Sequence, residues 1–154
     1  MRPVNKGEHN DFSKYQDAQI PLRNTIGRYC SYCEQSKELA VEHVVPHTKG
    51  GAKYEWENFL LGCTHCNLAK SNHNTSRDNY YWADQHNTAY VFQYLENNTI
   101  IPNPNLTDEE KQIAIETIGL TGLNRLPNSD NPPTEKDERW FQRQESWNKG
   151  HLSI

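Results

Sequence analysis

Two pairs of cysteines constrain this chain more than any other feature. Cys30 and Cys33 form one Cys-x-x-Cys pair, Cys63 and Cys66 form a second, and 29 residues separate the pairs. A two-residue gap lets both sulfurs of a pair turn toward one ion about 2.3 Å away, and four thiolates complete a tetrahedral zinc site. We therefore expect a structural Zn²⁺. Unrelated buried thiols do not explain why two such pairs are present. A thioredoxin-like redox pair is also disfavoured, because there are two pairs and neither begins a convincing βαβ unit.

The composition indicates that a bound metal ion would contribute much of the stability of the fold. Only 28 of the 154 residues are Leu, Ile, Val or Phe, and the mean hydropathy is −1.01, so aliphatic burial alone gives a thin core. In a site of this kind the free energy of zinc binding becomes folding free energy. No apolar run has the length of a membrane span, and residues 1–7 lack the apolar stretch of a signal peptide. We expect a cytoplasmic protein, because paired cysteines in that reducing compartment are usually metal ligands.

The hydrophobic pattern predicts an α+β fold. Around the cysteines, the β-rich runs 39–46 and 58–63, separated by Gly50-Gly51 and followed by residues 66–70, predict strand, loop, strand and helix. We expect three segments in one compact unit: an N-terminal arm over 1–27, a core over 28–77 and a C-terminal region over 78–154.

The two outer segments have weaker signals. The arm predicts a short helix over 12–18. In the C-terminal region, residues 90–101 predict a hairpin with a turn at Asn97-Asn98. Thr107, with capping-box spacing to Glu110, predicts a helix start, and Thr134 predicts the cap of a second helix over 135–149.

Residue types suited to phosphodiester hydrolysis lie between the cysteine pairs. Glu42 and His43 end the first predicted strand, and Asn67 directly follows Cys66. Hydrolysis requires a base that activates water and a hard cation that holds the scissile phosphate. His43 can act as the base. The oxygens of Glu42 and Asn67 suit Mg²⁺ or Mn²⁺.

These motifs together resemble the HNH endonucleases, a family with a ββα-metal fold. The resemblance covers residues 28–73 and is carried by Cys30-Ser-Tyr-Cys33, Val41-Glu-His-Val-Val-Pro46, Gly50-Gly51, Asn58-Phe-Leu-Leu-Gly-Cys63 and Cys66-Asn-Leu-Ala-Lys70. It implies a zinc-stapled ββα-metal core in which His43 is the general base and Asn58 holds the loop that orients it. It also implies that Glu42 and Asn67 bind the catalytic ion and that the four cysteines bind zinc.

The chain departs from the family pattern at two positions. Glu42 stands where the family more often has Asp, and Asn67 stands where it often has His. A non-catalytic zinc module that binds protein or nucleic acid, and an inactive HNH scaffold, are the alternative interpretations. The nuclease interpretation requires Glu42, His43 and Asn67 to face one another across a shared concave site.

A looser resemblance concerns the flanking segments. Residues 1–7, 120–125 and 139–143 are similar to a bacterial HNH subgroup whose nuclease subunits work beside an ATPase in anti-phage defence, as in Septu-type systems. This resemblance implies a partner ATPase.

The distribution of charge bears on DNA binding. Residues 1–77 carry a net charge of +2 and residues 78–154 carry −6, so unassisted binding to a polyanion should be weak. The side chains that we expect to contact DNA are His47, Lys49, Lys53, Lys70 and Arg77. Two of them have other possible roles: His47 can cap the glycine loop, and Lys70 can be a solvated helix lysine.

Two aromatic clusters are open to two interpretations each. Tyr80, Tyr81 and Trp82 can stack on bases, although in a chain short of aliphatic residues we favour a place in the core. Trp140, Phe141 and Trp147 mark the last predicted helix, which either closes back on the protein or docks on another one.

Overall fold

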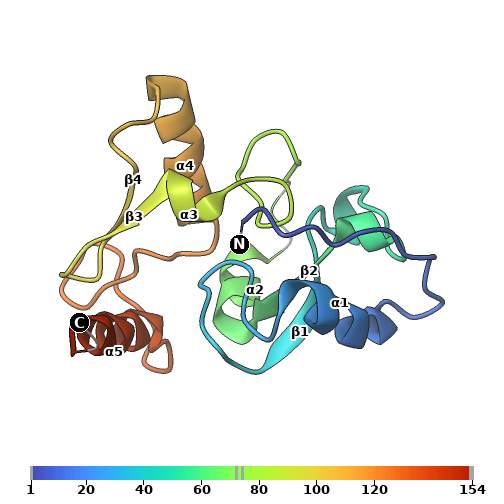
Figure 1. The fold of residues 1–154 in the computed structure, drawn as a ribbon, viewed down its shortest axis with the longest axis horizontal. Helices are drawn as coiled ribbons and strands as arrows, with labels where there is room; N and C mark the ends of the chain where they lie inside the picture. The colour runs from blue at the N-terminus through green and yellow to red at the C-terminus, as the bar shows by residue number, and fades with distance from the viewer. Residues whose placement is uncertain (1, 72, 74, 153–154) are drawn as a thin grey trace.

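The computed structural model describes residues 2–71, 73 and 75–152. The predicted segments also include residues 1, 72, 74, 153 and 154, which lie outside the described residues. The two small antiparallel sheets and the helices around them confirm the α+β class (Figure 1). Along the chain the α-helices and β-strands are α1 (Gln19–Ile26), β1 (Leu39–His43), β2 (Phe59–Cys63), α2 (Thr64–Lys70), α3 (Thr88–Val91), β3 (Phe92–Tyr94), β4 (Ile100–Pro102), α4 (Asp108–Leu120) and α5 (Arg139–Leu152).

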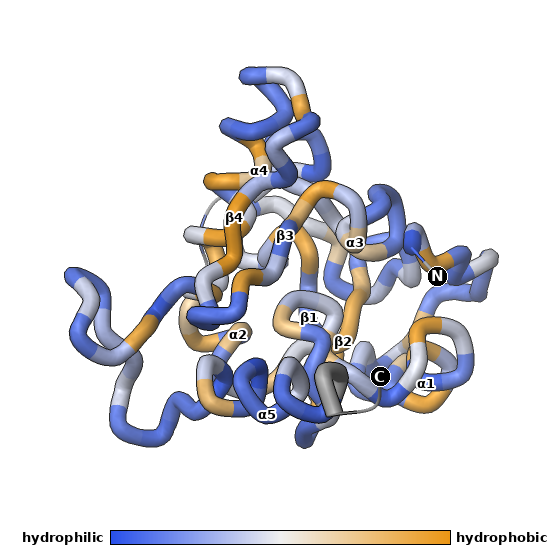
Figure 2. Tube along the Cα trace, turned by 60° about the vertical axis from the view of Figure 1, so that its left-hand side comes forward, coloured by the Kyte–Doolittle hydropathy of each residue, from blue (hydrophilic) through white to orange (hydrophobic). Residues whose placement is uncertain are grey.

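The predicted order of strand, loop, strand and helix is confirmed in the core. β1 and β2 pair antiparallel, with Leu39 opposite Cys63 and His43 opposite Phe59. All five residues of β2 are buried, because α1 and α2 both pack against this strand. A strand covered on both faces is apolar throughout, as the orange trace of β2 shows (Figure 2).

The loop between the two strands requires its two glycines. Gly50 has φ +88°, in the left-handed region that favours glycine. At Gly51 a Cβ atom would collide with the carbonyl group of Val45. The chain can therefore turn sharply after β1, which keeps the rest of the loop close to the end of that strand.

The C-terminal region follows the predicted order of hairpin and helices. β3 pairs antiparallel with β4, and α4 packs against β4. The capping box is confirmed: Thr107 Oγ1 accepts the N–H of Glu110, and Glu110 accepts the N–H of Thr107. Trp82 is 1% exposed, so its place in the core is also confirmed.

Two predicted helix positions are wrong. Residues 15–18 form a short 3-10 turn, and the α-helix of the arm, α1, follows it; Ala18, Leu22 and Ile26 bury one face at a spacing of four residues. The last helix begins at Arg139 rather than after Thr134. Thr134 instead accepts the N–H of Asp137 in a turn, and the Asp137 carboxylate accepts the N–H of Arg139.

The arm is tied to the core by a buried lysine. The ammonium group of Lys6 donates to the carbonyl oxygens of Trp56 (3.0 Å) and Phe59 (2.8 Å) and lies 3.0 Å from the carboxylate of Asp84. Arg77 binds the same carboxylate through both of its terminal nitrogens. Residues before and after the core therefore meet on one charged network. Within the described ranges, no helix is long and apolar enough to cross a membrane.

Candidate active site

The four cysteines converge on one point. Their sulfur atoms all lie within 4.8 Å of one another, and Cys33 Sγ is 3.8 Å from Cys63 Sγ. A tetrahedron with bonds of about 2.3 Å has edges of about 3.8 Å. All four side chains are buried and none forms a disulfide. The residues therefore fit a closed four-thiolate zinc site, which leaves no coordination position for water or substrate.

A buried arginine on α5 contacts this cysteine cluster. The guanidinium of Arg139 donates to Cys66 Sγ at 3.2 Å and is 2% exposed. The Asp137 carboxylate holds it through two bonds of 2.8 Å, and the carbonyl oxygens of Thr121 and Gly122 accept its remaining protons. A hydrogen bond to a ligating thiolate orients the ligand and offsets its charge. The C-terminal helix is thus fastened to the predicted zinc centre.

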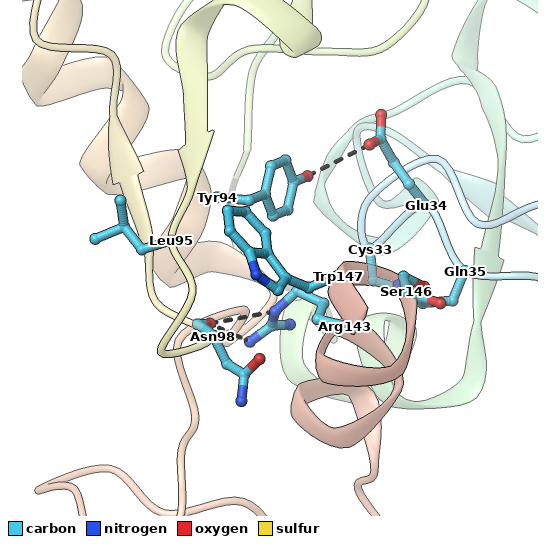
Figure 3. Close-up of a pocket in the computed structure, with 9 residues that line it drawn as sticks. All are labelled: Cys33, Glu34, Gln35, Tyr94, Leu95, Asn98, Arg143, Ser146 and Trp147. Carbon is cyan, nitrogen blue, oxygen red and sulfur yellow. Dashed lines mark hydrogen bonds between the residues drawn. The ribbon is translucent and has the colours of Figure 1, made fainter. Parts of the chain in front are cut away.

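A cavity of about 350 Å³ separates the β3–β4 hairpin from α5 beside the cysteine cluster (Figure 3). Tyr94 and Trp147 form part of its wall, and Arg143 reaches across to the carbonyl oxygen of Asn98. Trp140 and Trp147 are half-buried, whereas Phe141 is 45% exposed. The helix therefore closes back on the protein and still presents an aromatic side chain to solvent.

A second cavity brings together the three residues on which the nuclease interpretation depends. Glu42, His43 and Asn67 line one pocket of about 330 Å³, together with Val41, Pro46, His47, Thr48 and Ser71. β1 supplies the first two of the three and α2 supplies the third. The shared concave site required of a nuclease is present.

His43 is arranged as a base. Its Nε2 atom lies 3.0 Å from the carbonyl oxygen of Lys53. A carbonyl accepts only from N–H, so Nε2 carries the proton and Nδ1 is left as the acceptor. Burial lowers the pKa of His43 below its ordinary value, although the hydrogen bond to Lys53 acts in the opposite direction. The imidazole is therefore neutral at physiological pH and can accept a proton.

Asn58 fixes the loop that holds His43. Its amide group donates to the carbonyl oxygens of Val45 and Ala52, both at 2.8 Å, and its oxygen accepts the N–H of Val45 at 2.9 Å. Ala52 directly precedes Lys53, whose carbonyl oxygen contacts His43. This arrangement is the one that the family resemblance implies for Asn58.

The carboxylate of Glu42 is buried and held by two partners. One oxygen lies 2.6 Å from the ammonium group of Lys70, and the other accepts the hydroxyl proton of Tyr32. Burial raises the pKa of Glu42 above its ordinary value, and the charge of Lys70 opposes this effect. Each carboxylate oxygen has two lone pairs, so one on each oxygen remains for a metal ion.

Asn67 offers the second oxygen ligand. Its Nδ2 atom donates to the carbonyl oxygen of Gly62 at 3.4 Å, whereas its buried Oδ1 atom has no hydrogen-bond partner among the described residues. A buried oxygen without a donor is unusual in a folded protein, and metal coordination would satisfy it. Carboxylate and carboxamide oxygens are the ligands that Mg²⁺ and Mn²⁺ prefer, so the residues fit such an ion.

Two of the residues predicted to contact DNA, Lys70 and Arg77, are instead bound to carboxylates of the protein itself. Lys70 is 0% exposed and bonds to Glu42 and to the carbonyl oxygen of His43, which leaves it no surface for a phosphate. Arg77 forms an ion pair with Asp84 and also donates to the carbonyl oxygen of Glu57, so its guanidinium is already engaged within the protein. His47, Lys49 and Lys53 are exposed, and His47 lies at the pocket.

Sequence reasoning missed Tyr32 and Arg139 as contributors to the two sites. Tyr32 lies between two predicted zinc ligands, so its proximity to the metal could be inferred, but its contact with Glu42 could not. Arg139 is 73 residues from Cys66, and no spacing in the chain indicates their contact.

Comparison with known families agrees with this geometry. The HNH endonuclease family model matches residues 30–73, a segment that contains both cysteine pairs, β1, β2 and all of α2. No curated protein matches the chain. The matched segment supports a nuclease-type hydrolase domain.

Proposed function

We propose that this protein is a metal-dependent endonuclease that hydrolyses phosphodiester bonds, with DNA as its substrate. The observation that supports this proposal best is the pocket shared by Glu42, His43 and Asn67. It combines a neutral imidazole that has an acceptor nitrogen with two oxygen ligands that suit a hard cation. A zinc module that only binds would not need this arrangement.

The chemistry follows from the placement of these groups. Nδ1 of His43 accepts a proton from water as the water oxygen forms its bond to phosphorus and the bond to the 3′ oxygen breaks. The carbonyl oxygen of Lys53 stabilises the imidazolium that results, because it accepts the Nε2 proton. Glu42 and Asn67 would hold Mg²⁺ or Mn²⁺, which when bound neutralises the scissile phosphate and the leaving oxygen. The departing 3′ oxygen takes a proton from solvent water, and His43 later releases its proton to solvent, so the products carry a 5′-phosphate and a 3′-hydroxyl.

A partner protein is a second part of the proposal. With Lys70 and Arg77 bound to carboxylates, Lys49 and Lys53 are the predicted DNA contacts that keep exposed positive charges. Two lysines give little affinity for a polyanion at physiological salt. We therefore propose that the protein is the nuclease subunit of a bacterial defence complex in which an ATPase holds the DNA.

Plasmid cleavage tests the enzymatic proposal. The purified protein, with and without a candidate ATPase, is incubated with plasmid DNA and Mg²⁺ or Mn²⁺. The His43→Ala variant should lose cleavage by a factor of about 10² or more, because it lacks the base, while it retains zinc and its thermal stability. A folded, zinc-loaded wild-type protein that does not cleave under any of these conditions would instead be a non-catalytic zinc module.

A further inference from the structure

The carboxylate of Glu42 is fixed at both oxygens by residues that the zinc-binding segments supply. Tyr32, whose hydroxyl donates to one oxygen, lies between Cys30 and Cys33. Lys70, whose ammonium group lies 2.6 Å from the other oxygen, is in the last turn of α2, the helix that contains Cys66. Gathering the four cysteines around one ion therefore brings both partners to the same carboxylate.

We propose that Tyr32 and Lys70 are positioning residues that hold the carboxylate of Glu42 toward the catalytic ion, so that the zinc centre orients the active site through them. This inference rests on the proposed function, in which Glu42 is a ligand of Mg²⁺ or Mn²⁺. It assigns Lys70 a role in place of the DNA contact that its burial excludes.

The burial of these groups explains why positioning is needed. Glu42 is 8% exposed, and a buried charged group is costly unless it is paired and hydrogen-bonded. Lys70 supplies the compensating charge and is itself anchored by the carbonyl oxygen of His43 at 2.9 Å. Tyr32 adds a neutral hydrogen bond that restricts rotation of the carboxylate. Partners of this kind orient ligands and tune their affinity.

Binding of Mn²⁺ to the zinc-loaded protein, measured by electron paramagnetic resonance, tests the role of Tyr32. The Tyr32→Phe variant should bind Mn²⁺ about tenfold more weakly than wild type, because it loses only the hydroxyl that holds Glu42. Tyr94→Phe is the matched control, because the hydroxyl of Tyr94 donates to Glu34, a carboxylate outside the pocket. It should leave the affinity for Mn²⁺ unchanged. Zinc content and thermal unfolding report folding in each variant.

A double-mutant cycle tests Lys70. Lys70→Met should weaken Mn²⁺ binding in the wild-type background, although it removes a positive charge. In a Glu42→Gln background the same change should have no further effect, because the carboxylate that Lys70 holds is absent. A gain of affinity in Lys70→Met would show that Lys70 competes with the ion, and would overturn its assignment. If this variant does not fold, Tyr32→Phe decides the inference.

The outcomes separate this inference from the proposed function. Equal Mn²⁺ affinities in wild type and Tyr32→Phe would overturn the positioning role and leave the nuclease proposal standing. A wild-type protein that binds Mn²⁺ with the expected response to Tyr32→Phe, yet cleaves no DNA, would overturn the nuclease proposal alone. A wild-type protein that binds no Mn²⁺ would overturn both.

Discussion

At the scale of single residues, His43 shows how the fold sets the working state of a base. Partial burial disfavours the imidazolium, and the bond to the carbonyl oxygen of Lys53 favours it; the net result is a pKa below the ordinary 6.5. In the proposed mechanism the imidazole must be neutral to accept a proton from water, so we expect activity to fall as the pH falls through this pKa. Asn58 supports the second influence, because it fixes Ala52 and so the neighbouring carbonyl group of Lys53.

The pH dependence of cleavage tests this state. We expect kcat/KM to rise with pH and to reach half of its plateau below pH 6.5, measured with a saturating concentration of Mn²⁺. A midpoint at or above that value would assign the titration to a group other than His43.

Gly62 provides another prediction for a single residue. A Cβ atom at this position would overlap the carboxamide of Asn67, the far end of a flexible side chain. The Gly62→Ala variant should therefore keep its fold and zinc but displace Asn67, which raises the Mn²⁺ concentration needed for half-maximal cleavage by about tenfold. Gly119→Ala is the control, because a methyl group there meets no atom within 4 Å. An unchanged metal requirement in Gly62→Ala would show that Asn67 is not a ligand.

At the scale of secondary-structure elements, α5 stabilises the zinc centre from outside the matched segment. Arg139→Met removes the hydrogen bond to Cys66 Sγ and should lower zinc affinity by about tenfold, measured by competition with a chromogenic chelator. Arg143→Met, one turn further along the same buried face, is the control, because the hydrogen bonds of Arg143 go to the carbonyl oxygens of Asn98 and Leu123. Equal zinc affinities in Arg139→Met and wild type would show that α5 does not stabilise the zinc site.

Several elements were predictable because their signals are local. Apolar alternation, Gly50-Gly51 and the spacing from Thr107 to Glu110 each act within a few residues. The start of α5 was not predictable, because Thr134 and Asp137 are both good capping residues. The choice between them depends on the guanidinium of Arg139, which binds Asp137 and also contacts the buried cysteine cluster.

The candidate site was predictable only in part. Glu42, His43 and Asn67 were predictable as a set because their residue types suit a base and a hard cation and because the motifs that contain them resemble the HNH pattern. The state of Lys70 and Arg77 was not predictable, because whether a cation is exposed depends on carboxylates that tertiary structure brings to it. Lys70 meets Glu42 across the core, and Arg77 meets Asp84.

At the scale of the whole molecule, the charge distribution and α5 lead to a prediction about the partner that we propose. Phe141 is exposed on this helix, and buried aromatic anchors dominate the energy of many interfaces. Phe141→Ala should weaken association with the ATPase of a neighbouring gene by about tenfold or more, measured by titration calorimetry. Ile20→Ala, which removes a more exposed apolar side chain on α1, should not. Efficient cleavage by the isolated wild-type protein at physiological salt would make the partner unnecessary.

The buried ammonium group of Lys6 limits how this chain can be divided. It bonds to the carbonyl oxygens of Trp56 and Phe59 inside the segment that matches the HNH family model, and its carboxylate partner, Asp84, lies beyond that segment. A fragment cut at the limits of the matched segment would lose the donor for both carbonyls, and such losses are costly in a buried site. For protein engineering, the matched segment is therefore not expected to fold when it is transferred alone to another protein. A functional graft would have to include the arm that carries Lys6 and the chain as far as Asp84.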